Sequence, residues 1–314
     1  AFIQANHLKK YFKTPRGMLH AVDDVTLSIP KGKTLGIVGE SGCGKSTLGR
    51  LMLNLLEPTS GEMLLDGQNI YKLRSSQMKK MRTRAQMIFQ DPYSSLNPRM
   101  SVSEIIAEPI IANDLIKNRQ DIQKRVEELM DTVGLAQRFI NAYPHELDGG
   151  RRQRIGVARA LAVNPEFIVC DEPVSALDVS IQAQILNLMM DLQDELGLTY
   201  VFITHDLSVV KHISDEIAVM YLGQCVERVP SKELFQNPLH PYTKALLTAI
   251  PIPDLSTRGR KRQILTGEVK SPIEPKPGCR FAARCPNATA ACAEHVCNLK
   301  EVEPNHFVSC VLYE

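Results

Sequence analysis

Hydrophobic and polar positions alternate over residues 1–34, which predicts antiparallel strands with a turn at Pro30 to Gly32. The next apolar run, TLGIVG, predicts a buried strand, and TLGRLMLNLL after a glycine-rich turn predicts an amphipathic helix. EMLLDGQNI predicts a short strand pair with Asp66 and Gly67 as its turn. The N-terminal region therefore combines antiparallel strands with a strand–loop–helix unit.

The rest of the chain alternates between helical and strand patterns. Residues from about 101 to 142 carry apolar positions at three- and four-residue spacing, as in VSEIIAEPIIANDLI, which predicts helices. Two later apolar strands, FIVCDEP and TYVFITHD, alternate with the helical runs SIQAQILNLMMDLQDEL and LSVVKHISD. Strands that alternate with helices indicate an α/β fold with a parallel sheet and right-handed crossovers. Residues 250–278 are rich in proline and predict a linker.

Length, composition and charge narrow the class of protein. A chain of 314 residues favours one large domain with a smaller appendage. The hydrophobic fraction of 44% and the charged fraction of 23% are ordinary for a soluble globular protein, and a net charge of +2 gives no reason to expect nucleic acid. No apolar run approaches the roughly 18 residues that a membrane span requires, and the N-terminus lacks a secretion signal. We therefore expect a cytosolic protein that can dock on a membrane protein.

GESGCGKST, residues 39–47, fits the phosphate-binding pattern G-x-x-x-x-G-K-[ST] between a predicted strand and a predicted helix. The glycines allow successive N–H groups to turn toward phosphate oxygens, and the helix adds the positive end of its dipole. Lys45 is expected to reach the β- and γ-phosphates, and Ser46 to supply a hydroxyl to Mg²⁺. The predicted nucleotide-binding residues of this loop are Gly39, Ser41, Gly42, Cys43, Gly44, Lys45, Ser46 and Thr47. The loop predicts binding of ATP or GTP.

FIVCDEP ends a buried strand on two carboxylates, at the edge where parallel sheets place their ligands. Asp171 is expected to hold Mg²⁺, and Glu172 to polarise the water that attacks the γ-phosphate; alternatively, Glu172 caps the next helix. His205, at the end of the next strand, is expected to contact the γ-phosphate, with a structural histidine as the alternative. Gln90 in QMIFQDP is expected to be a catalytic residue and a Mg²⁺ ligand, and to link the Mg²⁺ site to the helical segment after it.

The motifs, taken in order, resemble those of ATP-binding cassette (ABC) transporter ATPases over nearly the whole chain. GESGCGKST resembles the Walker A motif, MIFQDP the Q-loop, LDGGRRQR the signature, FIVCDE Walker B, SALD the D-loop and ITHD the H-loop. In this family two subunits close head-to-tail, so the resemblance implies that Asp148, Gly149, Gly150 and Asp178 meet nucleotide at the dimer interface. It also implies that Phe12, with Tyr11 as its neighbour, stacks on adenine.

The resemblance implies a domain organisation as well. Residues 1–250 would form a P-loop NTPase domain with a RecA-like parallel-sheet core and an antiparallel β subdomain. A helical subdomain at about 91–158 would be inserted in this domain. Residues 251–314 would form a small C-terminal extension that consists of the proline-rich linker and a metal-binding cysteine cluster.

Finer features, DPYSSLNPR, AYPHEL and NPLHPYTKALL, resemble the ATPase subunits of dipeptide, oligopeptide and nickel importers. The resemblance implies ATP hydrolysis coupled to peptide uptake. Nickel uptake, a soluble non-transport ABC ATPase and a regulatory nucleotide-binding module are the alternatives. The implied partners are two membrane permease subunits, a second and non-identical ATPase subunit, and an external peptide-binding protein, with no nucleic acid. The implied location is the cytoplasmic face of a prokaryotic membrane.

Five of the eight cysteines crowd the C-terminal end: Cys279, Cys285, Cys292, Cys297 and Cys310. In a reducing compartment such clustering indicates a metal rather than disulfides. The importer family's C-terminal pattern matches Cys279, Cys285, Cys292 and Cys310, so the resemblance implies a 4Fe–4S cluster there and leaves Cys297 as a spare thiol. Zinc and no metal are the alternatives.

The signature stretch departs from the family pattern, which reads LSGGQ followed by RQR. Asp148 stands in place of the serine and Arg151 in place of the glutamine. An ionised carboxylate cannot donate a hydrogen bond to a phosphate, and it carries the same sign of charge. Arg151 is expected to offset part of that charge by pairing with Asp148 or by reaching the phosphate. We therefore expect a weakened second site and an unlike ATPase partner; alternatively, the loop tolerates the pair.

Overall fold

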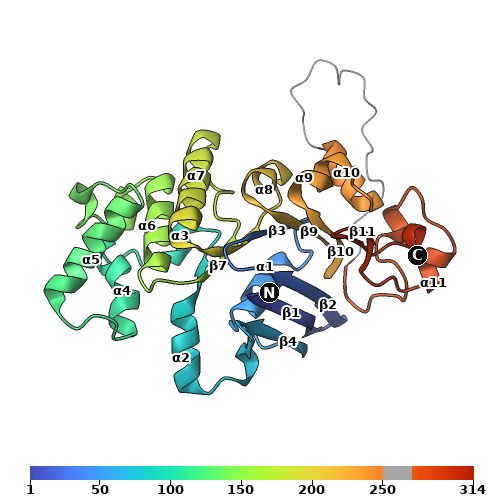
Figure 1. Ribbon diagram of the computed structural model, residues 1–314, viewed down its shortest axis with the longest axis horizontal. Coiled ribbons are helices and arrows are strands. Elements are labelled where there is room, and N and C mark those ends of the chain that lie inside the picture. The colour runs from blue at the N-terminus through green and yellow to red at the C-terminus, as the bar shows by residue number, and fades with distance from the viewer. Residues whose placement is uncertain (250–270) are drawn as a thin grey trace, which may run out of the picture.

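The computed structural model describes residues 1–249 and 271–314, so most of the expected proline-rich linker lies outside the described residues. Two sheets occupy the middle of the molecule (Figure 1). Helices α4 and α5 lie at one end, and the C-terminal extension lies at the other. The expected α/β fold with a separate antiparallel sheet and a helical part is therefore confirmed.

The smaller sheet is antiparallel, with strand order β2-β1-β4-β5. Its strands are β1 (Ile3–Thr14), β2 (Gly17–Ile29), β4 (Ser60–Leu65) and β5 (Gln68–Asn69). The Asp66–Gly67 turn is confirmed, and both residues have positive φ, 53° and 75°. The turn expected at Pro30 to Gly32 is present and connects β2 to β3, whereas the reversal between β1 and β2, at Thr14 to Gly17, was not predicted. Alternation fixes which residues share a face, but it does not show where the chain reverses.

The larger sheet has eight strands in the order β11-β12-β10-β9-β3-β8-β7-β6. They are β3 (Thr34–Val38), β6 (Ala85–Ile88), β7 (Phe167–Asp171), β8 (Thr199–Ile203), β9 (Glu216–Tyr221), β10 (Gln224–Pro230), β11 (Lys300–Glu303) and β12 (His306–Val308). In the part of the sheet with the order β9-β3-β8-β7-β6, all neighbouring strands are parallel, as expected for strands that alternate with helices. The pairs β9–β10, β10–β12 and β12–β11 are antiparallel, so the sheet is mixed.

The longer helices are α1 (Lys45–Met52), α2 (Ser75–Arg84), α4 (Val102–Ala112), α5 (Arg119–Thr132), α6 (Gly149–Leu161), α7 (Val179–Leu196) and α10 (Pro241–Ala249). The shorter ones are α3 (Pro92–Ser95), α8 (Leu207–Ile213), α9 (Ser231–Gln236) and α11 (Ala291–Glu294). Leu48 and Leu51 of α1 share one buried cluster with Leu8 of β1 and Ile203 of β8, so α1 packs between the two sheets. None of the helices in residues 1–249 or 271–314 has the length and apolar character needed to span a membrane.

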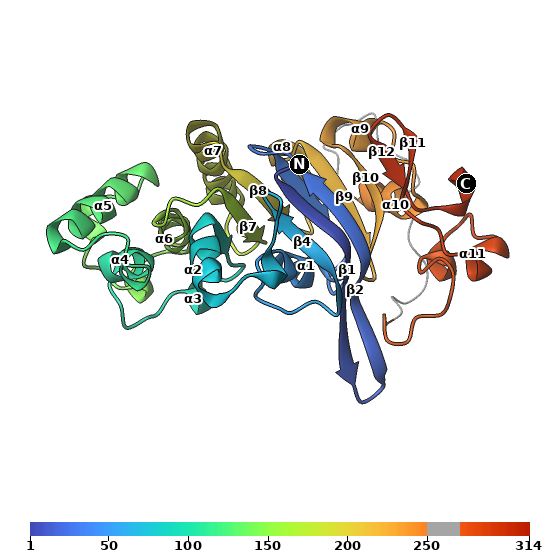
Figure 2. The same cartoon turned by 60° about the horizontal axis from the view of Figure 1, so that its bottom comes forward.

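The C-terminal extension continues the larger sheet. Strand β12 pairs with β10, with Glu227 opposite Val308. Glu227 is fully buried, and its carboxylate accepts hydrogen bonds from the Leu239 amide and from His306 Nε2, each at 2.7 Å. Residues 271–274 of the extension lie beside the β1–β2 hairpin (Figure 2), where the His20 amide donates to the Pro272 carbonyl at 2.9 Å. The sequence predicted a separate appendage here and did not predict strands that join the larger sheet.

Candidate active site

The predicted phosphate loop lies between the buried strand β3 and helix α1, as its sequence context required. Gly39 and Gly44 have φ of 151° and 100°. A Cβ atom would lie 2.2 Å from the Met220 carbonyl oxygen at Gly39 and 2.0 Å from the Ala21 carbonyl oxygen at Gly44. Both positions therefore require glycine, and the loop is held against β9 and β2.

Lys45 lies inside the curve of this loop. Its side chain is buried, and Nζ donates hydrogen bonds to the carbonyl oxygens of Gly39 at 2.8 Å and Glu40 at 3.1 Å. The ammonium group therefore sits at the first turn of α1, where the helix dipole also favours negative charge. A cation and a helix N-terminus that meet in a glycine loop suit the binding of phosphate.

Two of the predicted Mg²⁺ ligands face each other across the loop. Ser46 Oγ, on α1, donates to Asp171 Oδ1, at the end of β7, at a distance of 2.7 Å. Burial raises the pKa of the Asp171 carboxyl, and the Ser46 hydrogen bond acts in the opposite direction. A buried carboxylate beside a hydroxyl supplies the oxygen ligands that Mg²⁺ prefers, and a divalent cation would offset the effect of burial. The pair therefore fits a magnesium ion.

Two of the three predicted catalytic residues contact the carboxylate of the third, Glu172. Gln90 Nε2 donates to Glu172 Oε2 at 3.1 Å, and His205 Nδ1 lies 3.1 Å from the same oxygen. The Glu172 side chain is only 14% exposed, whereas that of His205 is 60% exposed. Gln90 therefore contacts the candidate base rather than the Ser46–Asp171 pair.

Glu172 has a positive φ of 46°, and its amide donates to the Ile203 carbonyl at 2.8 Å. Residues other than glycine seldom adopt such a φ, and a strained backbone of this kind clusters at functional sites. The alternative that Glu172 caps the next helix is wrong, because α7 has Asp178 at its N-cap position.

The signature loop lies apart from this cluster, at the start of α6. Asp148 caps that helix: Oδ1 accepts from the Arg151 amide at 2.8 Å, and Oδ2 accepts from Arg151 Nη1 at 2.7 Å. Gly150 packs so closely on α7 that a Cβ atom would lie 2.6 Å from Ile181 Cγ2. Among the described residues, no hydrogen bond joins Asp148, Gly149, Gly150 or Asp178 to the phosphate loop. The expected pairing of Arg151 with Asp148 is present.

The two predicted adenine-stacking residues are neighbours on β1 with different surroundings. The Tyr11 ring stacks on His20 with centroids 3.9 Å apart, and its hydroxyl donates to Asp23. Burial, and next the hydrogen bond to Asp23, raise the pKa of Tyr11. The Phe12 side chain projects from the opposite face of the strand, with Lys10 Nζ 5.0 Å from its ring centroid. Both rings are only partly buried.

The cysteines of the extension are free thiols in the structure. The Cys279 amide donates to the Cys292 carbonyl at 2.7 Å, which brings two cysteine-bearing segments together. Burial raises the pKa of Cys279, and the neighbouring thiols of Cys310 and Cys292 raise it further. Within residues 1–249 and 271–314, however, no three cysteine, histidine or acidic side chains are arranged to hold a metal ion. The structure therefore gives no support to the expected 4Fe–4S cluster or to zinc.

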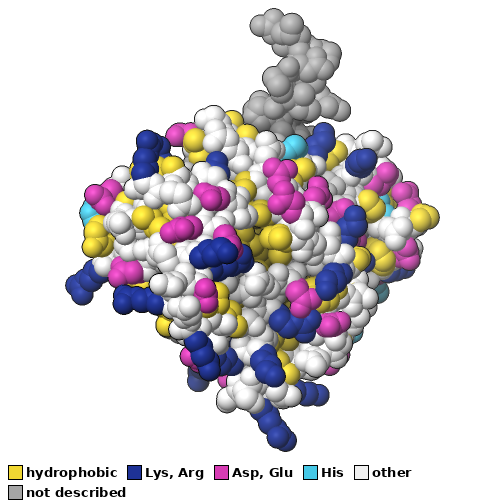
Figure 3. Space-filling view, turned by 60° about the vertical axis from the view of Figure 1, so that its left-hand side comes forward, with side chains coloured by type: hydrophobic (Ala, Val, Ile, Leu, Met, Phe, Trp, Pro, Cys, Tyr) yellow, Lys and Arg dark blue, Asp and Glu magenta, His cyan; other side chains and the backbone are white. Residues whose placement is uncertain are grey.

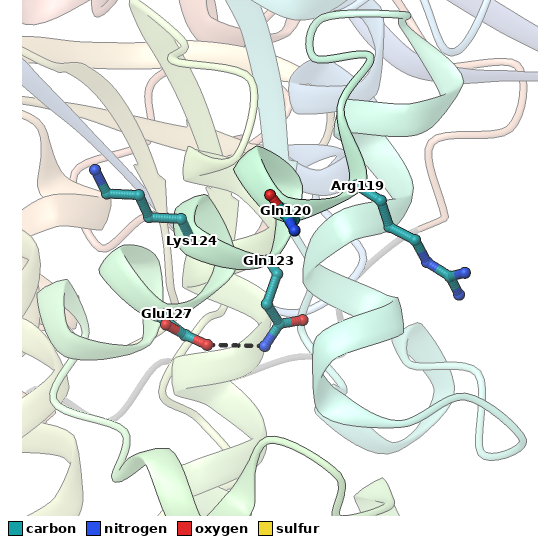
Figure 4. A pocket seen from close by; sticks show the side chains of 5 residues that line it. All are labelled: Arg119, Gln120, Gln123, Lys124 and Glu127. Carbon is teal, nitrogen blue, oxygen red and sulfur yellow. Dashed lines mark hydrogen bonds between the residues drawn. The ribbon is translucent and has the colours of Figure 1, made fainter.

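A surface hollow of about 420 Å³ lies along the outer helix α5 (Figure 4). Its lining is polar: Arg119, Gln120, Gln123, Lys124 and Glu127. Gln123 Nε2 donates to Glu127 Oε1 at 2.9 Å across it. It contains none of the predicted motif residues and is not part of the nucleotide site.

Sequence reasoning missed two carboxylates beside the site that bind arginines of the extension. Glu40 of the phosphate loop pairs with Arg284, and Asp23 near Tyr11 pairs with Arg280. The only sequence signal is the pair of arginines in GCRFAARC, next to the cysteines. Nothing local to that stretch indicates which acids the arginines meet.

A glycine loop with a buried lysine, a hydroxyl–carboxylate pair and a glutamate between a glutamine and a histidine are the parts of a P-loop nucleotide hydrolase. The family described as "ABC transporter" matches residues 22–175, and the family described as "Oligopeptide/dipeptide transporter, C-terminal region" matches residues 226–292. The chain belongs to the ABC transporter family, as an ATP-hydrolysing subunit with the C-terminal region of the oligopeptide/dipeptide group. The family expected from the motifs is therefore confirmed.

Relatives and solved structures agree with this assignment. The chain is 53% identical over 310 residues to the "Oligopeptide transport ATP-binding protein OppF" of Bacillus subtilis, covering 98% of this chain and 95% of that protein. It is 49% identical over 315 residues to the "Dipeptide transport ATP-binding protein DppF" of Haemophilus influenzae, again covering 98% and 95%. The dimeric ATP-binding cassette MJ0796 bound to ADP and Pi superposes with a TM-score of 0.67 at 30% identity, over 73% of this chain and 98% of that one.

Proposed function

We propose that this chain hydrolyses ATP to drive the import of dipeptides or oligopeptides through a membrane transporter. The convergence of Gln90 and His205 on the Glu172 carboxylate, beside the phosphate loop, carries the catalytic part of the proposal. The peptide substrate is supported by the names of the OppF and DppF relatives, each about half identical over nearly the full length.

The phosphate loop would bind the triphosphate through its backbone amides and Lys45. The loop residues with this role are Gly39, Ser41, Gly42, Cys43, Gly44, Lys45, Ser46 and Thr47. Ser46 and Asp171 would hold Mg²⁺, and Gln90, which here donates to Glu172, would be a third ligand. When bound, Mg²⁺ neutralises charge that develops on the phosphate oxygens. Phe12 would stack on the adenine, with Tyr11 fixed beside it by Asp23.

Glu172 would act as the general base for the attacking water. Its carboxylate is mostly shielded from solvent, and two side chains fix its orientation, which limits the reorganisation needed during the reaction. His205 would hold Glu172 through Nδ1 and reach toward the γ-phosphate from its exposed side. Gln90 would couple conformational changes at Glu172 to the helical part of the chain.

We further propose that the chain works beside a second, non-identical ATPase subunit. In a head-to-tail dimer the Asp148 loop would face the partner's phosphates, and Asp178 would lie near the same interface. Both Asp148 oxygens already accept hydrogen bonds from Arg151, so the loop offers a neutralised acceptor where the family has a hydroxyl donor. Full activity would then require an intact signature on the partner, opposite this chain's own Glu172.

Two permease subunits and an external peptide-binding protein would complete the transporter at the cytoplasmic face of the membrane. Phe89 and Tyr93, which flank Gln90, are 40% and 67% exposed and would lie under a permease. Figure 3 shows hydrophobic side chains among charged ones of both signs on the helical end of the molecule. A mixed surface of this kind suits a protein partner better than a polyanion.

Reconstitution with the permeases and the second ATPase tests the function. Wild-type complex should hydrolyse ATP faster when the binding protein delivers a dipeptide or an oligopeptide, and Glu172→Gln complex should bind ATP without turnover. Stimulation by Ni²⁺ and not by peptides would favour the nickel importer. Hydrolysis with no dependence on the permeases would favour a non-transport ATPase.

The 4Fe–4S cluster stays a separate proposal that rests on the resemblance of Cys279, Cys285, Cys292 and Cys310 to the C-terminal pattern of the importer family. Iron and acid-labile sulfide, measured after anaerobic purification, should be present in equal amounts if the cluster exists. Stoichiometric zinc without iron, or neither element, would reject it.

A further inference from the structure

Arg284, in the C-terminal extension, binds the phosphate loop directly. Its Nη1 donates to Glu40 Oε2 at 2.7 Å and its Nη2 donates to Glu40 Oε1 at 3.0 Å. The Arg284 side chain is only 8% exposed, so this is a fork-to-fork pair largely shielded from water. Glu40 immediately follows the first glycine of the loop and lies 244 residues away from Arg284 in the sequence.

Glu40 in turn fixes the atoms around Lys45. The Glu40 carbonyl accepts from Lys45 Nζ at 3.1 Å, and the Glu40 amide donates to the hydroxyl of the buried Tyr242 at 2.9 Å. The Tyr242 ring packs against Phe281 of the extension, with centroids 5.3 Å apart. Arg284 and Phe281 therefore hold the first half of the loop from two directions.

Arg280 makes the equivalent connection on the side of the predicted adenine contacts. It forms a salt bridge with Asp23, and the two side chains are 7% and 14% exposed. Asp23 also accepts hydrogen bonds from the Tyr11 hydroxyl and from His20 Nδ1. Burial opposes ionisation of Asp23, but the bonds from Tyr11 and His20 and the charge of Arg280 outweigh it and hold the Asp23 pKa below its usual value.

Arg280 also touches the back of the phosphate loop. Its Nη1 donates to the Leu222 carbonyl, and the amide of the next residue, Gly223, donates to the Cys43 carbonyl at 2.8 Å. The Asp23 amide completes the connection by donating to the Gly223 carbonyl at 2.8 Å. One arginine thus joins the strand that carries His20 to the loop that carries Lys45.

We propose that Arg280 and Arg284 are positioning residues of the nucleotide site, so that docking of the C-terminal extension sets the affinity for ATP. The inference rests on the proposed ATPase function. Arg284 acts through Glu40 on the phosphate loop, and Arg280 acts through Asp23 on the Tyr11–His20 pair. Neither arginine needs to touch the nucleotide, because each holds a carboxylate that lies beside the nucleotide site. The extension would then contribute to ATP binding, in addition to the strands that it adds to the larger sheet.

The test compares Arg284→Gln, Arg284→Lys and Glu40→Gln with wild type in the full complex, by the KM and kcat of ATP hydrolysis. Binding of a fluorescent ATP analogue, followed by anisotropy because the chain has no tryptophan, gives the affinity directly. Arg284→Gln should raise KM about tenfold and change kcat less than threefold, since it loosens binding and leaves Glu172 intact. Arg284→Lys should recover part of the affinity, because lysine keeps the charge but loses the fork.

Arg228→Gln is the matched control. Arg228 Nε lies 3.0 Å from Glu216 Oε1, with side chains 15% and 24% exposed, and its guanidinium lies 4.4 Å from the Phe307 ring of the extension. It should disturb folding as much as Arg284→Gln and leave KM unchanged. Should Arg284→Gln fail to fold, Glu40→Gln and Arg284→Lys test the same pair.

The inference is overturned if folded Arg284 and Glu40 variants keep the wild-type KM, or if Arg228→Gln raises KM equally. A double variant of Glu40 and Arg284 should have the same KM as the worse single variant, because the two groups act as one unit. If the wild-type complex hydrolyses ATP and the Arg284→Gln variant has the wild-type KM, only this inference is rejected. Wild-type complex that neither binds nor hydrolyses ATP rejects the proposed function itself.

Discussion

Replacing Asp148 by serine and Arg151 by glutamine restores the family pattern in the signature loop and tests the proposed weak site. Asp148 caps α6 through the Arg151 amide at 2.8 Å, and serine is an equally good N-cap, so the helix should survive the change. The Asp148–Arg151 pair is 58% and 43% exposed, so its loss should cost less than about 1 kcal/mol of folding stability. Any larger effect must come from the partner's nucleotide.

The magnitude follows from the charge that the loop would present to that nucleotide. At about 4 Å and an effective dielectric near 20, one carboxylate–phosphate pair repels by about 4 kcal/mol. Arg151, whose Nη1 lies 2.7 Å from the carboxylate, offsets part of this. If about 2 kcal/mol remains, the double variant should tighten the weaker ATP site about 30-fold and raise the turnover of the complex. Arg151→Gln alone should have the opposite effect, because it leaves the carboxylate unpaired.

The assay measures ATP turnover and the affinity of each nucleotide site in the assembled transporter. Asn118→Ser is the control, since Asn118 caps the neighbouring helix α5 through the Gln120 amide at 3.0 Å and lies outside the signature. Unchanged turnover and unchanged affinity in the double variant would refute the weak site. A similar gain in Asn118→Ser would trace the effect to helix capping.

Three further predictions concern catalysis and stability. Glu172→Gln should lower the rate of phosphate release by about 10²- to 10⁴-fold and preserve ATP affinity, since it removes the base and keeps the shape; a rate within tenfold of wild type would exclude Glu172 as the base. Glu227→Ala should cost about 3 kcal/mol in urea unfolding, because it leaves the buried Leu239 amide and His306 without their acceptor; a loss below about 1 kcal/mol would contradict this. Burial lowers the pKa of His240 from 6.5 to about 4, so the folded state binds fewer protons than the unfolded state and loses stability as pH falls from about 6.5 to about 4. His240→Gln should flatten the pH dependence of unfolding in that window, whereas the same change at the exposed His7 should leave it intact.

The sequence predicted the parts of the site that a short stretch of chain determines. GESGCGKST forms its loop because glycines, a preceding strand and a following helix all lie within twenty residues of one another. The strand ends that carry Asp171 and His205 could be placed at one edge because parallel strands align their carboxyl ends. The contact of Gln90 with Glu172 was not predicted, since it depends on how β6 and β7 pair.

Hydrophobic alternation predicted neither the position of the β1–β2 hairpin turn nor the strands of the extension. The turn between Thr14 and Gly17 lies in a stretch where alternation continues on both sides. Strands β11 and β12 are four and three residues long, too short for a periodic signal. Their place in the sheet follows from pairing with β10, which is a long-range event.

By itself, the sequence determined the family, the strands and helices that carry the nucleotide-site motifs, and the chemical groups of that site, because these depend on short motifs and their order along the chain. Tertiary structure decided which groups meet. It turned Gln90 and His205 toward Glu172, and it placed Arg280 and Arg284 beside Asp23 and Glu40. These last contacts join residues more than 240 positions apart, whose segments are brought together by the pairing of β12 with β10 and by the contact of residues 271–274 with the β1–β2 hairpin. Local preferences carry no information about such a contact, because its stability comes from burial that exists only once the sheet is complete.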